Sequence, residues 1–319
     1  MNTPLTDAAN IPVDERTAVV TYSPVVLQVP GRAVPLEVKV SMPATGDNLP
    51  VILFSHGHGA SNFLSSLNGY GPLAGFWASH GFVVLQPTHL DSKALALDPD
   101  GPEGPLYWKS RAQDMHYILD HLDEIEAAVP GLAGRIDRDK IAAAGHSLGG
   151  HTTCMLLGMR VTDPVDDIEV DLSDPRVKAG VVLAAPGNGD DLAPFASEHY
   201  TVLRYTNFST MTAPALVVAG DKDLNARFSD RVSYRQDAYF LSPSPKRMLL
   251  LYGAEHILGG VSGFDAAETS DEDPERVAAL RAMAWAYLRS QLYPGDTAWD
   301  DAVGALESMS SPFGRVESK

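Results

Sequence analysis

The turn at residues 145–149, Gly-His-Ser-Leu-Gly, constrains the fold of this chain more than any other stretch. Apolar residues 141–144 before it predict a buried strand, and residues 151–159 after it predict a helix. In a Gly-x-Ser-x-Gly turn between a strand and a helix, the serine is strained and the two glycines allow close backbone approach. Because the pattern also occurs in ordinary turns, the hypothesis that Ser147 is a nucleophile depends on the rest of the chain.

The composition is that of a globular protein and excludes several classes of function. Of the 319 residues, 45% are hydrophobic and 20% are charged, which is enough for a sizeable core. The net charge of -17 would repel nucleic acid and anionic membranes, so neither is expected as a partner. The sequence contains no run of about 18 apolar residues, so a membrane span is not expected. The single cysteine, Cys154, excludes an internal disulfide and a cysteine-rich metal site.

The ends of the chain differ in composition from its middle. Residues 1–16 predict a flexible segment, and they lack the basic start and apolar run of a secretory signal, so we expect a cytoplasmic protein. Residues 17–295 predict one α/β domain, and residues 296–319 predict a polar C-terminal tail. The sequence does not define an oligomeric state.

Strands and helices alternate along the predicted domain. Residues 17–29 and 33–41 alternate between β-branched and polar side chains, which predicts an antiparallel hairpin at one edge of a sheet. Continuous apolar runs predict strands covered on both faces, as in a central, mostly parallel sheet flanked by helices; these runs are 50–54, 81–87, 141–144, 177–185, 214–219 and 246–252. Helices are expected over 64–80, 110–129, 151–159 and 274–292.

Two long segments between strands could form the walls of a pocket. Residues 89–108 are rich in Asp, Gly and Pro and end in Tyr107 and Trp108. Residues 188–212 show no steady period but contain several aromatic side chains, which is compatible with a small lid insertion and equally with a loop packed on the domain. Their apolar residues indicate a small-molecule substrate with a hydrophobic group of undefined size.

The chain supplies a base and an acid in the order that a serine nucleophile requires. A serine hydroxyl needs a histidine to take its proton and a carboxylate to orient that histidine. Asp223 follows the strand predicted over 214–219, and His256 follows the strand predicted over 246–252. The order Ser147, Asp223, His256 is the one expected of a sheet with a nucleophile elbow. The sequence therefore predicts these three residues as catalytic.

Other carboxylates remain alternatives for the acid. Asp221 lies two residues before Asp223, and Asp190 and Asp191 follow the preceding strand. The oxyanion formed on attack also needs backbone donors, each worth about 2.7 to 4 kcal/mol in acyl transfer. We expect the amides of Leu148, directly after the nucleophile, and of His58, in the glycine-rich loop after the first buried strand, to form this oxyanion hole.

Several motifs resemble those of the α/β-hydrolase fold. These are Gly-His-Ser-Leu-Gly-Gly at 145–150, Gly-Asp-Lys-Asp at 220–223 and Gly-Ala-Glu-His at 253–256. A branch of this fold holds dienelactone-hydrolase-like proteins, platelet-activating-factor acetylhydrolases, chlorophyllases and cutinase-like polyester hydrolases. The motifs that resemble this branch are Phe-Ser-His-Gly at 54–57, Ser-His-Gly-Phe-Val-Val at 79–84, Arg111-x-x-Asp114 and Asp-Pro-Arg-Val-Lys-Ala at 174–179.

The resemblance implies hydrolysis of carboxylic esters without a cofactor, with Ser147, Asp223 and His256 at the positions of the family triad. The chain also departs from this pattern. Dienelactone hydrolases proper carry a cysteine where this chain has Ser147, so their substrate is not expected here. Secreted members carry signal peptides and often disulfides, and without these an extracellular polymer is a less natural substrate.

Other functions use the same residues or none of them. Amide, carbamate or thioester hydrolysis and acyl transfer need the same nucleophile and oxyanion hole, so the sequence does not separate them from ester hydrolysis. A non-catalytic binding protein on this fold is a further alternative. The pairs His56-x-His58 and His89-x-Asp91 could in principle hold a metal, but the triad already accounts for hydrolysis. We therefore expect neither a metal nor a cofactor.

Overall fold

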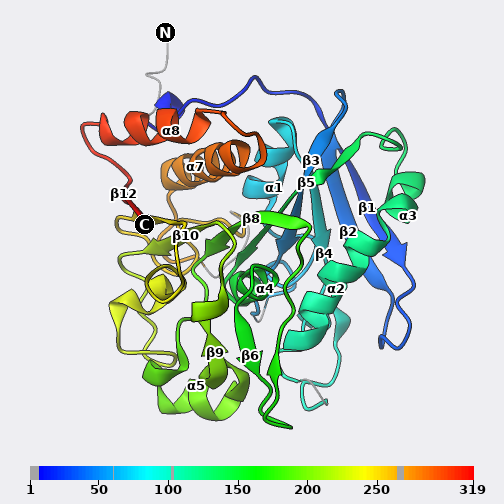
Figure 1. Cartoon of the computed structure of the whole chain (residues 1–319), viewed down its shortest axis with the longest axis vertical. Coiled ribbons are helices and arrows are strands. Elements are labelled where there is room, and N and C mark those ends of the chain that lie inside the picture. Colours follow the sequence, from blue (N-terminus) through cyan, green and yellow to red (C-terminus); the bar gives the residue numbers. More distant parts are fainter. Residues whose placement is uncertain (1–6, 60, 102–103, 264–268) are drawn as a thin grey trace.

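A nine-stranded sheet forms the centre of the computed structural model, which describes residues 7–59, 61–101, 104–263 and 269–319 (Figure 1). The strand order is β1-β2-β4-β3-β5-β8-β10-β11-β12. The six strands from β4 to β11 run parallel, whereas β1, β2 and β12 at the edges pair antiparallel with their neighbours. The strands are β1 (Val19–Leu27), β2 (Leu36–Pro43), β3 (Leu49–Ser55), β4 (Val83–Pro87), β5 (Ile136–His146), β8 (Val177–Leu183), β10 (Ala215–Gly220), β11 (Lys246–Leu251) and β12 (Gly314–Ser318).

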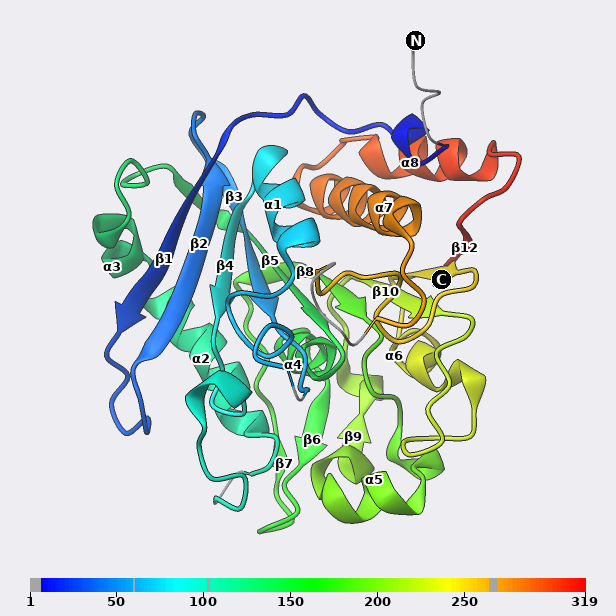
Figure 2. The ribbon, with the colours of Figure 1, turned by 180° about the vertical axis from the view of Figure 1, so that it is seen from behind.

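Helices cover both faces of this sheet. One face packs against α2 (Trp108–Asp120), α3 (Leu122–Ala128) and α4 (Leu148–Leu156), which lie in front in Figure 1. The other face packs against α1 (Gly71–Ser79), α7 (Pro274–Leu292) and α8 (Ala298–Glu307), and Figure 2 shows α1 and α7 on this side.

Strand β3 shows why the central runs are apolar throughout. Val51 and Leu53 belong to the core on the α2 and α4 side, whereas Ile52 and Phe54 belong to the core on the α1 and α7 side. Because successive side chains point to opposite faces, a strand covered on both faces has no polar positions. The mostly parallel sheet and the antiparallel N-terminal hairpin predicted from the sequence are both present.

Two predicted helices differ from those observed. Instead of one helix over 64–80, α1 begins only at Gly71, after Tyr70 in a left-handed conformation, and Pro72 lies in its first turn. Proline is favoured there because the first turn leaves its amides unbonded, so Gly-Pro starts this helix rather than interrupting it. The helix predicted over 110–129 divides into α2 and α3 at His121.

The two ends of the chain are more ordered than the sequence suggested. Residues 296–319, expected as a polar tail, form α8, which packs against α7, and β12, which pairs with β11. The buried side chains of α8 are Trp299, Ala302 and Leu306, a sparse apolar stripe in a mostly polar stretch. In the expected flexible segment, Asp7–Asn10 forms a short 3₁₀ helix near α7, whereas residues 1–6 lie outside the described residues.

The segment 188–212, predicted as a possible lid, is built from short elements below α4 in Figure 1. It contains α5 (Pro194–His199), β9 (Thr206–Asn207) and 3₁₀ helices at Gly189–Asp191, Thr201–Tyr205 and Phe208–Thr210. Strand β9 pairs with β6 (Arg160–Thr162), which pairs with β7 (Glu169–Val170), so a second sheet of three strands holds the segment. This small sheet was not predicted, because strands of two or three residues carry no periodic pattern.

The remaining elements are short. They are α6 (Asp237–Phe240) and 3₁₀ helices at Lys93–Leu95 and Val232–Gln236. Residues 102 and 103 of the segment 89–108 lie outside the described residues. Among the helices that the structure describes, none is both long and apolar enough to cross a membrane.

Candidate active site

The elbow at Ser147 has the geometry that its glycines predict. Strand β5 ends at His146, α4 begins at Leu148, and Ser147 between them has φ 54° and ψ -118°. A Cβ atom on Gly145 would lie 2.1 Å from the carbonyl oxygen of Gly149, and one on Gly149 would lie 1.9 Å from that of Ser55. Any side chain at these two positions would therefore push the turn away from the sheet.

Ser147, His256 and Asp223 form one hydrogen-bonded line at the carboxyl ends of three parallel strands. His256 Nε2 lies 2.9 Å from Ser147 Oγ, and His256 Nδ1 lies 2.9 Å from Asp223 Oδ2. Since an ionised carboxylate only accepts, Nδ1 carries the proton and the lone pair of Nε2 faces the serine hydroxyl. The histidine side chain is 31% exposed and the aspartate side chain 1%. The imidazole therefore faces the solvent side of the site, while the carboxylate is buried.

Two neighbouring side chains, those of His256 and Arg235, keep Asp223 ionised. Burial by itself raises the pKa of this carboxyl, but His256 and the Arg235 guanidinium outweigh it and lower the pKa to about 2. Arg235 Nε lies 3.6 Å from Asp223 Oδ2, and the guanidinium packs over the rings of Phe228 and Tyr234. Asp223 is therefore ionised throughout the neutral pH range.

The alternative acids make other contacts. Asp221 accepts a hydrogen bond from the Gly253 amide at 2.7 Å, which closes a turn between the two loops. Asp191 pairs with Arg231 at 2.8 Å, and Asp190 accepts from the side chain of Asn188. Of the four carboxylates considered, the structure brings Asp223 to the histidine.

The two amides expected to form the oxyanion hole lie at the start of α4 and after β3. Neither the Leu148 amide nor the His58 amide donates to a protein acceptor within the part of the chain that the structure describes. The His58 ring is held separately, because its Nδ1 lies 2.9 Å from Asp91 Oδ2. Both amides are thus available to a bound oxygen, while the imidazole is committed to Asp91.

A buried network of charged and polar side chains lies behind the loop that carries His58. The Arg111 guanidinium bonds to Asp91, to the His56 carbonyl and, at 3.3 Å, to Ser55 Oγ, and it is fully buried. Burial raises the pKa of Asp91, but Arg111, the hydrogen bond with His58 and the nearby His56 together outweigh burial and hold this pKa well below its usual range. The end of β3 is therefore attached to a buried ion pair rather than left as a free loop.

A second ion pair extends this network. Arg32 Nε lies 2.9 Å from Asp114 Oδ1, and Asp114 Oδ2 lies 2.9 Å from His89 Nδ1. Burial raises the pKa of Asp114 to about 6, against the opposing effect of Arg32. The other ring nitrogen of His89 lies 2.9 Å from Ser55 Oγ, so the second pair reaches the same strand end.

The histidine pairs considered as metal ligands are parts of these networks. Both ring nitrogens of His56 are engaged, Nδ1 with the Gly57 carbonyl at 2.6 Å and Nε2 with the His89 amide at 3.0 Å. His58 and His89 bond to carboxylates. Among the described residues, no group of three or more His, Cys, Asp or Glu side chains is arranged to hold a metal ion.

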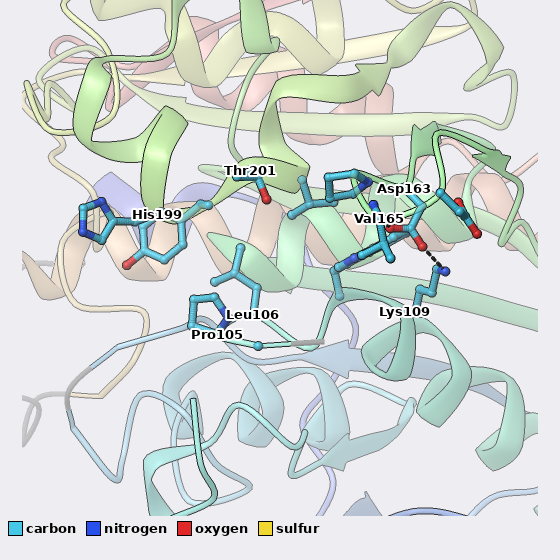
Figure 3. A pocket seen from close by; sticks show the side chains of 13 residues that line it. Pro105, Leu106, Lys109, Asp163, Val165, His199 and Thr201 are labelled. Atoms are coloured by element: carbon cyan, nitrogen blue, oxygen red, sulfur yellow. Dashed lines mark hydrogen bonds and ion pairs between the residues drawn. The ribbon is translucent and has the colours of Figure 1, made fainter. Parts of the chain in front are cut away.

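A cavity of about 340 Å³ lies between the two segments proposed as pocket walls (Figure 3). Tyr200 lines it and also meets the His58 ring edge-on, with the ring centroids 6.2 Å apart. An ion pair between Lys109 and Asp163 stands at one side. The apolar lining residues are Pro105, Leu106, Trp108, Pro164, Val165 and Val202.

Several residues at the site had no recognisable signal in the sequence. Arg235 lies twelve residues after Asp223 in an irregular stretch, and Tyr70 precedes a helix start; nothing in either pattern indicates a functional position. Arg111 and Asp114 were singled out only within a family motif, without a role. Side chains of this kind act through contacts between distant segments, so a motif search does not find them.

The fold and the site together define a class of protein. A parallel sheet flanked by helices, with a serine elbow after one strand and an acid and a histidine after two later strands, is the α/β-hydrolase fold, and the predicted fold class is confirmed. The family model described as platelet-activating factor acetylhydrolase, isoform II, matches residues 24–98. The chain is also similar to proteins of two groups, platelet-activating factor acetylhydrolases and cutinases, which confirms the predicted resemblance for these groups.

The matches to these relatives cover only part of each protein. Platelet-activating factor acetylhydrolase of Canis lupus familiaris is 30% identical over 178 residues, which are 44% of this chain and 36% of the relative. Cutinase 1 of Thermobifida cellulosilytica is 26% identical over 210 residues, which are 65% of this chain and 58% of the relative. The chain thus matches less than two thirds of the length of either relative.

Proposed function

We propose that this protein is a serine hydrolase that cleaves carboxylic esters through an acyl-enzyme intermediate. The observation that carries the proposal is the line from Ser147 Oγ through His256 to Asp223, with 2.9 Å at each step. The names of its relatives, acetylhydrolase and cutinase, support the same chemistry.

In the proposed mechanism, each group has a role in the two half-reactions. Ser147 Oγ attacks the ester carbonyl carbon while His256 Nε2 accepts the hydroxyl proton, and Asp223 stabilises the imidazolium that forms. The carbonyl oxygen takes the negative charge, and the amides of Leu148 and His58 donate to it. His256 then protonates the departing alcohol, and a water molecule, activated by the same histidine, releases the acid and restores Ser147.

Replacement of the nucleophile tests this proposal. With short p-nitrophenyl esters, Ser147→Ala should lower kcat by about 10⁴-fold or more, because it removes the hydroxyl that lies 2.9 Å from His256 Nε2. Ser209→Ala, which removes an exposed serine far along the chain from the elbow, should leave kcat unchanged. A fluorophosphonate should label the parent stoichiometrically at Ser147. Hydrolysis by Ser147→Ala at the parent rate would exclude the mechanism, and a clear preference for a matched amide or thioester would exclude the ester assignment.

We also propose that the cavity of Figure 3 receives a hydrophobic group of the ester. Its lining is mostly apolar, and Tyr200 joins it to the ring of His58, whose amide is one of the expected oxyanion donors. A volume of about 340 Å³ is at the small end of the range for ligand pockets, which favours a short chain or a single ring.

A second hollow at the site makes this assignment testable. A cleft of about 450 Å³ is lined by Asp223 and His256 together with Leu224 and Ile257. In a series of esters of increasing acyl and alcohol chain length, Leu106→Trp should shift the optimum to shorter chains by filling the cavity of Figure 3. Leu224→Trp, which changes the other cleft, should leave the optimum in place. The reverse result would assign the hydrophobic group to the cleft beside the triad.

A further inference from the structure

A buried tyrosine and a buried histidine connect the loop of the oxyanion hole to the loop of the catalytic base. The Gly57 amide lies 2.9 Å from Tyr70 Oη, and Tyr70 Oη lies 2.9 Å from His146 Nδ1. His146 Nε2 lies 2.7 Å from the carbonyl oxygen of His256. Tyr70 and His146 are both 0% exposed, so no solvent competes for these bonds. The three bonds form one chain across the floor of the site.

The direction of every proton in this chain follows from its last acceptor. The His256 carbonyl only accepts, so His146 Nε2 carries the proton and Nδ1 has a lone pair. Tyr70 therefore donates its hydroxyl proton to His146 Nδ1, and its oxygen accepts from the Gly57 amide. Burial, together with the nearby His256, lowers the pKa of His146 to about 3, so this ring is neutral at the pH where the reaction runs. The chain thus has one consistent arrangement.

Gly57 is held at both of its backbone polar groups. Its amide donates to Tyr70 Oη, and its carbonyl oxygen accepts from His56 Nδ1 at 2.6 Å, because His56 Nε2 accepts from the His89 amide. The carbonyl of Gly57 and the amide of His58 belong to one planar peptide unit, in which the two groups point in opposite directions. The bond from His56 to the Gly57 carbonyl therefore determines where the His58 N–H points, and the bond to Tyr70 fixes the preceding peptide unit, which carries the Gly57 N–H.

The close approach of Tyr70 requires a glycine at position 57. A Cβ atom there would lie 2.9 Å from Tyr70 Oη and 3.4 Å from His146 Nδ1. The tyrosine is itself held from two sides, because its amide donates to the Ser262 carbonyl at 2.8 Å and its ring packs on Phe54 with centroids 4.8 Å apart. Its hydroxyl is therefore a rigid support rather than a mobile contact.

We propose that Tyr70 and His146 are positioning residues that set the distance between the oxyanion donor at His58 and the base at His256. This inference rests on the proposed function, since it assigns a role within the same reaction. Ser147 follows His146 directly, so the chain of bonds joins three segments of the site: the loop of the oxyanion hole, the elbow and the loop of the base. Loss of the bridge should weaken transition-state binding while leaving ester binding intact.

The variant Tyr70→Phe removes the hydroxyl and keeps the ring. It should lower kcat for a p-nitrophenyl ester by about tenfold and change KM by less than about twofold, as expected when an interaction is made chiefly in the transition state. An alkyl trifluoromethyl ketone, which reacts with the serine to give a charged hemiketal, should bind more weakly by the same factor. Tyr287→Phe is the matched control, because Tyr287 is also buried but lies in α7, where it packs against Trp299 of α8, and this variant should match the parent.

A second variant tests whether the two residues act as one unit. His146→Gln keeps a donor that can reach the His256 carbonyl but does not reproduce the acceptor for Tyr70. If the bridge acts as proposed, kcat of the double variant Tyr70→Phe/His146→Gln should lie within about twofold of kcat of the less active single variant. Substitutions of contacting residues in one network do not have additive effects. Additive losses would overturn the bridge, as would a Tyr70→Phe enzyme with parental kcat and ketone affinity.

The outcome separates this inference from the proposed function. If Ser147→Ala hydrolyses esters like the parent, the serine mechanism itself fails. If hydrolysis depends on Ser147 but Tyr70→Phe behaves like Tyr287→Phe, the mechanism stands and the positioning bridge fails. A fall in melting temperature with unchanged kcat would give Tyr70 a structural role only and would also overturn the bridge.

Discussion

The two sides of Ser147 are supported in different ways. On the oxyanion side, the loop after β3 is attached to fully buried ion pairs centred on Arg111 and Asp114. On the base side, the His256 side chain is 31% exposed, and its ring is held by one buried carboxylate, Asp223, which has Arg235 at 3.6 Å. An oxyanion donor is a backbone group that must not move, whereas a base must exchange protons with substrate and water. The comparison indicates that the oxyanion side is the more firmly held of the two, and it is the side where a backbone amide must keep its position.

The largest expected effect concerns the base side. Asp223→Asn should lower kcat by about 10⁴-fold, because an amide no longer holds the histidine in the tautomer that accepts the serine proton. Asp221→Asn, two residues away, should stay within about threefold of the parent, since Asp221 bonds to the Gly253 amide. Steady-state kinetics on one ester would measure both. Equal losses in the two variants would contradict the assignment of the acid.

A substitution on the oxyanion side should instead change the free energy of unfolding. Arg111→Met leaves Asp91 buried without its cation, and breaking a buried ion pair in this way typically costs about 3 to 5 kcal/mol in the free energy of unfolding. Arg315→Met, which removes an exposed pair with Glu317, should cost about 0 to 1 kcal/mol. Urea denaturation measures both. A parental midpoint for Arg111→Met would show that the two sides are not supported differently.

Lowering the pH should remove the stability that Asp223 contributes on the base side, over a defined pH range. The pKa of Asp223 is about 2 in the folded protein and 3.8 in its ordinary state, so the unfolded chain binds its proton first as the pH falls. The stability that this carboxylate contributes is therefore present above pH 4 and is lost between pH 4 and pH 2, by about 2 kcal/mol. The difference in unfolding free energy between the parent and Asp223→Asn should shrink over this range, and a constant difference would contradict the shift.

The smallest expected effect is a change in a pH profile. Arg235→Gln removes a positive charge beside Asp223, so the carboxylate should stabilise protonated His256 more strongly. The acidic limb of kcat/KM should then move to higher pH by about half a unit. Arg204→Gln, which removes an exposed charge stacked on Tyr205, controls for net charge and should not move the limb. A shift toward lower pH would contradict the role of Arg235.

Much of the fold was predictable because it depends on local patterns. The apolar runs of β3, β4, β8, β10 and β11 announce strands covered on both faces, and α7 extends over the residues predicted for it. The prediction was less successful where an element has a weak pattern. Helix α8 buries three side chains in a polar stretch, and β12 is a polar edge strand whose partner, β11, lies more than sixty residues earlier.

The sequence by itself determined the elbow at Ser147 and the order of acid and histidine, because glycine sterics and the ends of parallel strands are local properties of the chain. Only the tertiary structure decided what supports them. Tyr70 reaches His146 across 76 residues, and His146 reaches the His256 carbonyl across 110. Such bonds depend on how the packed sheet places distant loops within 3 Å of one another, and no local pattern encodes that distance.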